Sequence, residues 1–369
     1  MKIERIEVYH VRMPLLRPWR AGHGDEAAIE SIFVKLVSGR LYGWGESSPL
    51  ATPTYSPEWA GGLFLVLARY MAPQVLGKEV ASGEALQALL APVKGNHFAK
   101  AALDQAWWDM HARGLGQPLW KSLGGRKSVV KVGADFGVKD SFAELLSEIE
   151  AAVKAGYLRV KLKYRPGWAL EMIREVRSAF PTQIFHVDCN STYTLSDLPM
   201  FRELDAFGLA MIEQPLMHDD LVDHAKLQKE IDTPICLDES ITSVSKARKA
   251  IELKSCGWIN IKPGRVGGLT NALAIHDVCA RAGMPCWVGG MLESSLGAHQ
   301  CLALATLPNF TYPNDVFPSH TYYRTDLCDP PVVLSGVSEI TAPDTPGSGA
   351  EPNPRRLQDQ TIAREVISL

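Results

Sequence analysis

The chain lacks the features that would commit it to a nucleic acid, a membrane or an oxidising compartment. Its net charge of −3 provides no basic field. No apolar run reaches the roughly 20 residues that span a bilayer, and residues 1–16 show no apolar core of a secretory signal. Seven cysteines are scattered without a Cys-x-x-Cys pair, which favours reduced, buried thiols. We therefore expect a cytoplasmic protein without nucleic-acid or membrane partners.

Nucleotide-binding motifs are also missing. No G-x-G-x-x-G turn follows a strand, and there is no Walker loop, which disfavours an open, doubly wound nucleotide-binding sheet. The 369 residues, of which 46 % are apolar, can instead supply a barrel of about 250 residues and a smaller domain.

The first third of the chain reads as strands followed by helices. Period-two alternation predicts strands over 2–15, 28–39 and 42–47, and helical periodicity predicts helices over 57–76, 83–93 and 97–113. Strands followed by helices are typical of a segregated α+β domain. We assign this domain to residues 1–126.

From residue 129 onward, strands and helices alternate. The predicted strands are 129–137, 158–164, 183–190, 209–216, 233–240, 258–266, 285–292 and, more weakly, 311–317. The intervening helices begin near Ser141, Trp168, Thr194, Leu221, Ser243, Leu269 and Ser294. This alternation predicts an α/β fold, a (β/α)7β TIM-type barrel over 127–318. Residues 319–369, which include a Pro/Gly-rich loop, are expected to return to the first domain.

Five charged residues stand one βα unit apart at the ends of short apolar runs. They are Lys163, Asp188, Glu213, Asp238 and Lys262, at steps of 25, 25, 25 and 24 residues. Charges at the same end of successive parallel strands point into one space, and in a barrel that space is the C-terminal mouth. The spacing therefore predicts one shared site.

The three acids of this series are candidate metal ligands. Asp188, Glu213 and Asp238 offer only oxygen donors, and no histidine holds a matching position, which favours Mg²⁺, with Mn²⁺ as a substitute. Asn190 shares the strand face of Asp188 and could bind a metal-bound water, but it could equally form a turn. Taken singly, each acid could be a solvated rim residue.

The lysines are candidate acid–base groups. Lys161 and Lys163 project to the same side of one strand, so each should disfavour protonation of the other and lower its pKa. Lys262 lies four strands further round, on the opposite side of the mouth. Glu239 could pair with Lys262, and a protonated Glu293 could donate a hydrogen bond; both could instead form rim salt bridges.

Such a set suits removal of a proton beside a carboxylate, because a divalent cation can stabilise the resulting enediolate by several kcal/mol. A Schiff-base aldolase would also use a barrel lysine, but it needs no set of three carboxylates. A protein of another class, a non-catalytic barrel that retains the site, is disfavoured by the complete set of acids and lysines.

Six strings carry a resemblance to a known family. They are VKLK (160–163), VDCN (187–190), IEQP (212–215), LDES (237–240), NIKPGRVGG (260–268) and GGMLES (289–294). Together they resemble the enolase superfamily, and Lys-x-Lys with a further lysine looks like its muconate-lactonising subgroup. The resemblance implies that Lys163 is the principal base, Lys161 its modulator and Lys262 a cation beside the enediolate. It also implies Mg²⁺ on Asp188, Glu213 and Asp238.

Within the subgroup, the chain looks most similar to o-succinylbenzoate synthases and N-succinylamino acid racemases. This implies dehydration to o-succinylbenzoate in menaquinone biosynthesis. The alternative that it implies is racemisation of an N-succinylamino acid, or the reaction of another N-acylamino acid racemase or cycloisomerase of the same subgroup. The partner is then a small-molecule carboxylate. The oligomeric state stays open, and a homo-oligomer is compatible with the sequence.

The substrate contacts are where the chain departs from the family pattern. The expected contacts are Trp19, Arg20, Asp135, Gly290 and Met291. A loop over 17–25, which includes His23, is expected to cover the mouth. Arg20 could receive a distal carboxylate or could be a solvated loop residue. Asp135 would repel a succinyl carboxylate unless it is paired or turned away.

Overall fold

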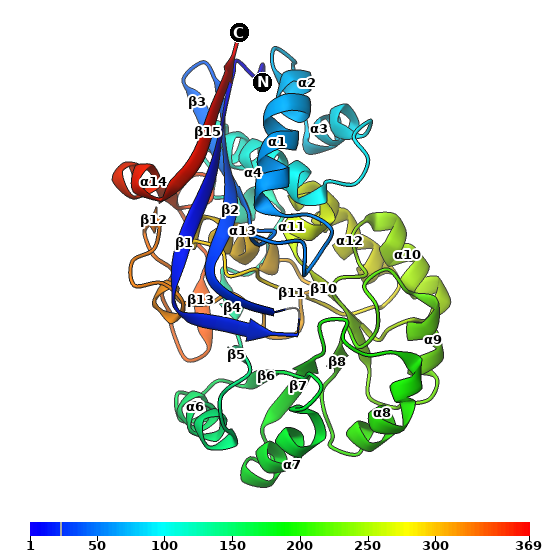
Figure 1. Cartoon of the computed structure of the whole chain (residues 1–369). Helices are drawn as coiled ribbons and strands as arrows, with labels where there is room; N and C mark the ends of the chain where they lie inside the picture. The colour runs from blue at the N-terminus through cyan, green and yellow to red at the C-terminus, as the bar shows by residue number, and fades with distance from the viewer. Residues whose placement is uncertain (23) are drawn as a thin grey trace.

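A four-stranded antiparallel sheet brings the two ends of the chain together (Figure 1). The computed structural model describes residues 1–22 and 24–369. The role predicted for His23 in covering the mouth therefore lies outside the described residues. The sheet order is β15–β1–β2–β3, with β1 at Arg5–Ala21, β2 at Gly24–Ser38, β3 at Leu41–Ser47 and β15 at Thr361–Ser368. Strand β15 pairs with β1 from Arg5↔Ser368 onward. The domain bounds assigned from the sequence stay a prediction.

Residues 17–21 and 24–25 continue the first two strands, so the prediction of a loop there was wrong. A bulge between Pro14 and Trp19 shifts the register of β1, after which Trp19 pairs with Glu26 and Arg20 with Asp25. A bulge bends a strand without ending its pairing. The β1–β2 hairpin therefore reaches as far as the barrel, where the amide N of Val138 donates to the carbonyl O of Arg20 at 3.0 Å.

One face of the sheet carries helices. They are α1 (Ala60–Val66), α2 (Ala72–Val75), α3 (Gly83–Leu90), α4 (His97–Gly114) and α5 (Leu119–Ser122), with a π-helical turn at Leu67–Met71 between α1 and α2. The long helix α4 packs against β3, where Gly43 and Gly45 allow the two backbones to meet. A Cβ on Gly45 would lie 2.6 Å from the amide N of Ala106.

We expect Gly45→Ala to lower the free energy of unfolding by about 3 kcal/mol, because the added carbon meets backbone atoms that cannot rotate away. Gly114→Ala is the matched control, since its Cβ would meet only the Leu41 side chain at 3.4 Å. Denaturant unfolding monitored by circular dichroism measures both. Equal stability of the two variants would show that β3 and α4 are not in close contact.

The second unit is a curled parallel sheet of seven strands in the order β11–β10–β9–β8–β7–β6–β5. Its strands are β5 (Ala134–Phe136), β6 (Arg159–Lys163), β7 (Ile184–Asp188), β8 (Ile212–Glu213), β9 (Ile235–Leu237), β10 (Trp258–Ile261) and β11 (Cys286–Val288). The helices that follow them are α6 (Phe142–Lys154), α7 (Ala169–Ala179), α8 (Leu198–Asp205), α9 (Val222–Gln228), α10 (Val244–Leu253), α11 (Pro263–Val266), α12 (Leu269–Arg281) and α13 (Ser295–Ala305). The α/β barrel architecture predicted from the alternation is confirmed.

The helix starts follow the predicted caps. The Ser243 hydroxyl accepts from the amide N of Lys246 at 3.2 Å, and Thr194 forms a capping box with Asp197. Each satisfies amide groups that the first helical turn leaves without partners. None of the helices in the described ranges is long and apolar enough to cross a membrane.

The ring is closed irregularly, which corrects two predicted strands. Residues 311–317 form no regular strand; the segment makes the single bridge Val132↔Asn314, and Phe310 just before it makes another with Cys286. The predicted strand 129–137 is divided, and β4 (Val129–Lys131) pairs with β13 (Glu339–Thr341) instead of with the barrel. Gly133 separates its two parts where the buried side chain of Arg159 lies against the backbone.

The remaining elements belong to the C-terminal segment. They are a 3-10 turn at Ser319–Thr321, β12 (Cys328–Asp329), β14 (Glu351–Pro352) and α14 (Pro354–Gln360). Within the barrel, a further 3-10 turn at Leu195–Asp197 precedes α8. Strands β12 and β14 pair with each other. The segment thus follows the barrel wall at β4 before it reaches β1.

Candidate active site

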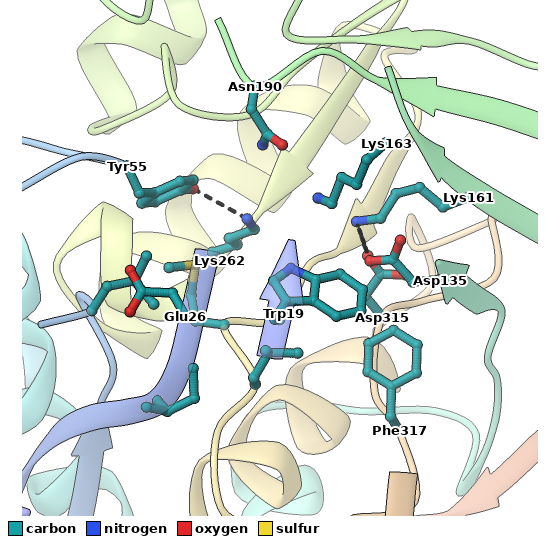
Figure 2. Close-up of a pocket in the computed structure, with 15 residues that line it drawn as sticks. Trp19, Glu26, Tyr55, Asp135, Lys161, Lys163, Asn190, Lys262, Asp315 and Phe317 are labelled. Carbon is teal, nitrogen blue, oxygen red and sulfur yellow. Dashed lines mark hydrogen bonds and ion pairs between the residues drawn. The ribbon is translucent and has the colours of Figure 1, made fainter. Parts of the chain in front are cut away.

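The lysines predicted from the sequence line one cavity (Figure 2). Lys161 and Lys163 project from β6, and Lys262 directly follows β10. In Figure 2, Lys262 lies across the cavity from Lys161 and Lys163. Strands β6 and β10 are four positions apart in the sheet, so the predicted opposition of the lysines agrees with their placement.

Each lysine has an acid partner that the sheet register provides. Asp135 and Lys161 are register neighbours, as are Lys163 and Asp188. Lys163 Nζ donates to Asp188 Oδ2 at 2.6 Å, Lys161 Nζ lies 3.1 Å from Asp135 Oδ2, and Lys262 Nζ donates to Asp238 Oδ2 at 2.9 Å. The lysines, Asp188 and Asp238 are buried and the Asp135 side chain is only 5 % exposed, so the charges compensate one another in a medium where an unpaired charge would be costly.

The expected mutual lowering of the lysine pKa values was wrong for Lys161. Burial alone would lower the pKa of Lys161, but Asp135 and Asp315 outweigh it and raise that pKa well above its ordinary value. The pKa of Lys262 is raised as well, because Tyr55, Glu213 and Glu239 outweigh its burial. The surrounding acids therefore dominate over repulsion between the lysines, and both groups are held as cations.

The three predicted metal ligands lie on neighbouring strands. Asp188 and Glu213 are register partners on β7 and β8, and Asp238 directly follows β9. All three side chains are buried. Burial would raise the pKa of Asp188, but Lys163 and Lys161 hold it well below its usual range. The pKa of Glu213 is raised by burial and by the charge of Asp188.

As the side chains stand, no three His, Cys, Asp or Glu residues in the described chain lie close enough together to hold a metal ion. Asp188 points to Lys163, and Asp238 points to Lys262 and to Arg265. The donor chemistry nevertheless fits Mg²⁺. Buried Glu213 Oε2 has no hydrogen-bond partner among the described residues, although Lys161 Nζ and His186 Nε2 lie 3.9 and 3.4 Å away. An oxygen-only set with such an open acceptor suits a hard cation.

The supporting residues occupy other positions than the sequence suggested. Glu239 is contacted by Asn190 Nδ2 at 3.3 Å, and no direct bond to Lys262 forms within the described ranges, so the predicted Glu239–Lys262 pair is wrong. Burial and the charge of Asp188 raise the pKa of Glu239 to about 8. Glu293 Oε2 accepts from the amide N of Met291 at 2.8 Å, which makes this carboxylate a support for the turn that lines the cavity.

Four of the five predicted substrate contacts lie in the cavity, and the fifth, Arg20, does not. Trp19, Asp135, Gly290 and Met291 line the cavity, and Lys163 Nζ lies 5.7 Å from the centre of the Trp19 ring. The repulsion expected from Asp135 is reduced by its pairing with Lys161. Arg20 does not line this cavity; its guanidinium pairs with Asp140 and Asp25. The proposed capture of a distal carboxylate by Arg20 therefore has no support here.

Four residues of the site were missed from the sequence: Tyr55, Asn260, Arg265 and Asp315. The Tyr55 hydroxyl accepts from Lys262 Nζ at 3.2 Å and donates to Asp238 Oδ1 at 3.2 Å, and Asn260 Nδ2 donates to Glu213 Oε1 at 2.6 Å. Asp315 pairs with Lys161 and with Arg159. Asn260 and Arg265 stand inside the NIKPGRVGG string, and Asp315 stands in the weak eighth strand, so these three carried a signal. Tyr55 stands in the segment between β3 and α1, where no pattern marked it.

The arrangement can support proton transfer at a carbon held between two amines. Lys163 and Lys262 face one cavity from opposite walls, and they pair with the buried acids Asp188 and Asp238. Trp19, Tyr55, Met291 and other apolar groups from the capping hairpin and the loops narrow its opening. Exclusion of water from such a site strengthens every charge interaction inside it.

Comparison with known proteins places these features in context. Residues 4–124 match the model of the mandelate racemase/muconate lactonizing enzyme N-terminal domain, and residues 144–356 match that of the enolase C-terminal domain-like family. The chain is 43 % identical over 368 residues to an o-succinylbenzoate synthase of Geobacillus stearothermophilus. The alignment covers 100 % of this chain and 98 % of that protein.

Two further relatives agree. The chain is 41 % identical over 368 residues to an N-succinylamino acid racemase of an Amycolatopsis species, with 100 % of both chains covered. A crystal structure from Listeria innocua, described as a member of the enolase superfamily, is similar with a TM-score of 0.95 at 33 % identity, covering 100 % of this chain and 99 % of that one.

Proposed function

Because the chain belongs to the enolase superfamily, in its muconate-lactonising subgroup, we propose that it removes an α-proton from a carboxylate substrate in a Mg²⁺-dependent reaction that forms o-succinylbenzoate by dehydration. The resemblance stated from the sequence motifs is confirmed, and the chain is an enzyme whose relatives are lyases and isomerases. The observation that carries the proposal is the pair Lys163 and Lys262, which line one cavity and pair with the buried carboxylates Asp188 and Asp238.

In the proposed dehydration, Lys163 acts as the general base and then as the general acid. It breaks the α-C–H bond as a base and returns the proton to the departing hydroxyl, so that the C–O bond breaks and water leaves. Lys163, which donates to Asp188 Oδ2, must lose one ammonium proton before the first step so that its lone pair can accept the α-proton. Lys262, held as a cation by Tyr55 and nearby acids, stabilises the negative charge that develops on the substrate oxygens.

Members of the superfamily use Mg²⁺, and here Asp188, Glu213 and Asp238 would hold it. When bound, the ion supplies positive charge for the enediolate oxygens. Lys161 is kept protonated by Asp135 and Asp315, and so adds a fixed positive charge next to Lys163.

A second candidate is racemisation of N-succinylamino acids. It is favoured by the opposed lysines, since a base on each face can remove the α-proton from one enantiomer and deliver it to the other. The racemase relative at 41 % identity supports it further. In that reaction Lys262 would have to lose its proton, whereas the dehydration requires it only as a cation.

Two assays test the proposal. The first measures o-succinylbenzoate formation from the cyclohexadiene carboxylate precursor with Mg²⁺ and with EDTA. The second measures solvent deuterium uptake at the α-carbon of N-succinylamino acids under the same conditions. We expect Mg²⁺-dependent turnover in the first. Absence of both dehydration and exchange over a panel of carboxylates would support a non-catalytic barrel.

Lys262→Arg should separate the two reactions. Arginine keeps the positive charge but cannot act as a base, so we expect racemisation to fall at least about 10-fold further than dehydration. The kcat values of both reactions in the variant, relative to the native enzyme, give the comparison. Equal loss in both reactions would contradict the assignment of Lys262 as a cation in the dehydration.

A further inference from the structure

One carboxylate in the cavity has no role in the proposed chemistry. Glu26 lies at the tip of the β1–β2 hairpin, directly opposite Trp19 in the strand pairing. Opposite residues of an antiparallel pair project from the same face, and both side chains line the cavity. Figure 2 shows Glu26 on the same side as Lys262 and Tyr55, away from Asp135 and Asp315.

Glu26 is the exception in the charge pairing of the cavity. Lys161 is matched by Asp135 and Asp315, Lys163 by Asp188, and Lys262 by Asp238. Glu26, in contrast, makes no hydrogen bond and no ion pair with any residue in the ranges 1–22 and 24–369. Its burial and the neighbouring Glu30 both raise its pKa, and no cation among the described residues offsets them.

Glu26 is half-buried in a cavity with apolar as well as charged lining residues, so the lack of a partner for its charge is unfavourable. Ile29, Leu50 and Met291 line the same cavity and are buried. A partly desolvated carboxylate among such groups is stabilised by a cation or a strong hydrogen-bond donor. Since the lysines already have acid partners, a bound ligand can supply that group.

We propose that Glu26 is a specificity residue that receives a cationic group at the distal end of a substrate, and that the enzyme therefore also acts on N-acylamino acids with basic side chains. This inference rests on the proposed α-proton chemistry. An α-carbon between Lys163 and Lys262 lets the acyl arm and the side chain of the amino acid extend in different directions. A basic side chain is favoured on the Glu26 side, and an acidic one is repelled from it.

The test compares kcat/KM for N-succinyl-L-arginine, N-succinyl-L-methionine and N-succinyl-L-glutamate in the presence of Mg²⁺. The native enzyme should prefer the arginine derivative to the glutamate derivative. In Glu26→Gln the arginine-to-methionine ratio should fall about 10-fold or more, the effect of losing one charge-assisted hydrogen bond. An unchanged ratio, or a native preference for glutamate, would overturn the inference.

Glu30→Gln is the matched control. It removes a negative charge from the same strand, but Glu30 is outside the cavity and pairs with His10 Nε2 at 2.8 Å. An equal fall of the ratio in both variants would assign the effect to the general field of the hairpin and overturn a direct contact.

Binding provides a second readout that does not require turnover. Calorimetric titration of the Mg²⁺-loaded protein with N-succinyl-L-arginine should give a Kd that rises about 10-fold in Glu26→Gln. No binding to the native protein, or the same Kd in both, would overturn the inference. The proposed function fails on a different result, the absence of dehydration and of α-proton exchange in the native enzyme.

Discussion

Lys163→Ala should lower kcat for o-succinylbenzoate formation by about 10³-fold, within the range that a positioned general base contributes. The physical reason is the place of the amine: Lys163 Nζ is buried in the cavity, beneath the Trp19 ring, and no other described amine lies on that wall in a comparable state, since Lys161 is held by two acids. Alanine removes the base and leaves the acids in place. Steady-state kinetics with saturating substrate measures the loss.

The control for this variant is Lys131→Ala. Lys131 is half-exposed and pairs with Glu339 at 2.6 Å on the barrel wall, so its removal takes away a lysine and an ion pair far from the cavity. Its kcat should stay close to the native value, and thermal unfolding should show that both variants fold. A Lys163→Ala enzyme that keeps more than one tenth of the native kcat would contradict the role of Lys163 as the base.

Glu213→Gln should abolish the response of the protein to Mg²⁺ and lower kcat/KM by about 10³-fold, equivalent to about 4 kcal/mol of lost stabilisation of the transition state. Glu213 carries the buried oxygen without a hydrogen-bond partner, and glutamine replaces a charged ligand by a neutral one of the same shape. The measurements are activity as a function of Mg²⁺ concentration and the rise of Tm when Mg²⁺ is added, which reports binding without turnover.

Glu203→Gln provides the comparison, because Glu203 is an exposed partner of Arg174 and should not alter the Mg²⁺ response. Addition of EDTA should bring the native enzyme to the activity level of Glu213→Gln. If Mg²⁺ raises the Tm of Glu213→Gln as much as that of the native protein, Glu213 is not a ligand.

The sequence was informative wherever a periodic pattern fixed both the element and its end. The steps between Lys163, Asp188, Glu213, Asp238 and Lys262 placed these residues at the same end of successive strands, and the register pairs Lys163↔Asp188 and Asp188↔Glu213 follow from the same alternation. The barrel and its helix caps were predictable for the same reason, since local propensity and strand spacing agree there.

The rest depended on contacts between segments far apart in the chain. Asp315, which together with Asp135 raises the pKa of Lys161, stands 154 residues away from it in the chain. Its segment makes only single bridges to the barrel and forms no regular strand. Tyr55 and Glu26 reach the cavity from the N-terminal unit, so their positions depend on how the two units dock. A hairpin that bends at a bulge between Pro14 and Trp19 reads locally as a loop.

The pairing of β15 with β1 has a consequence for synthesis of the protein. Strand β1 is translated before the barrel, whereas its outer neighbour β15 is translated after it. Until β15 has been made, one edge of the N-terminal sheet offers unpaired backbone groups, which can recruit foreign strands. The nascent chain thus carries an open edge throughout barrel synthesis, and β15 is the covering strand that ends this exposure.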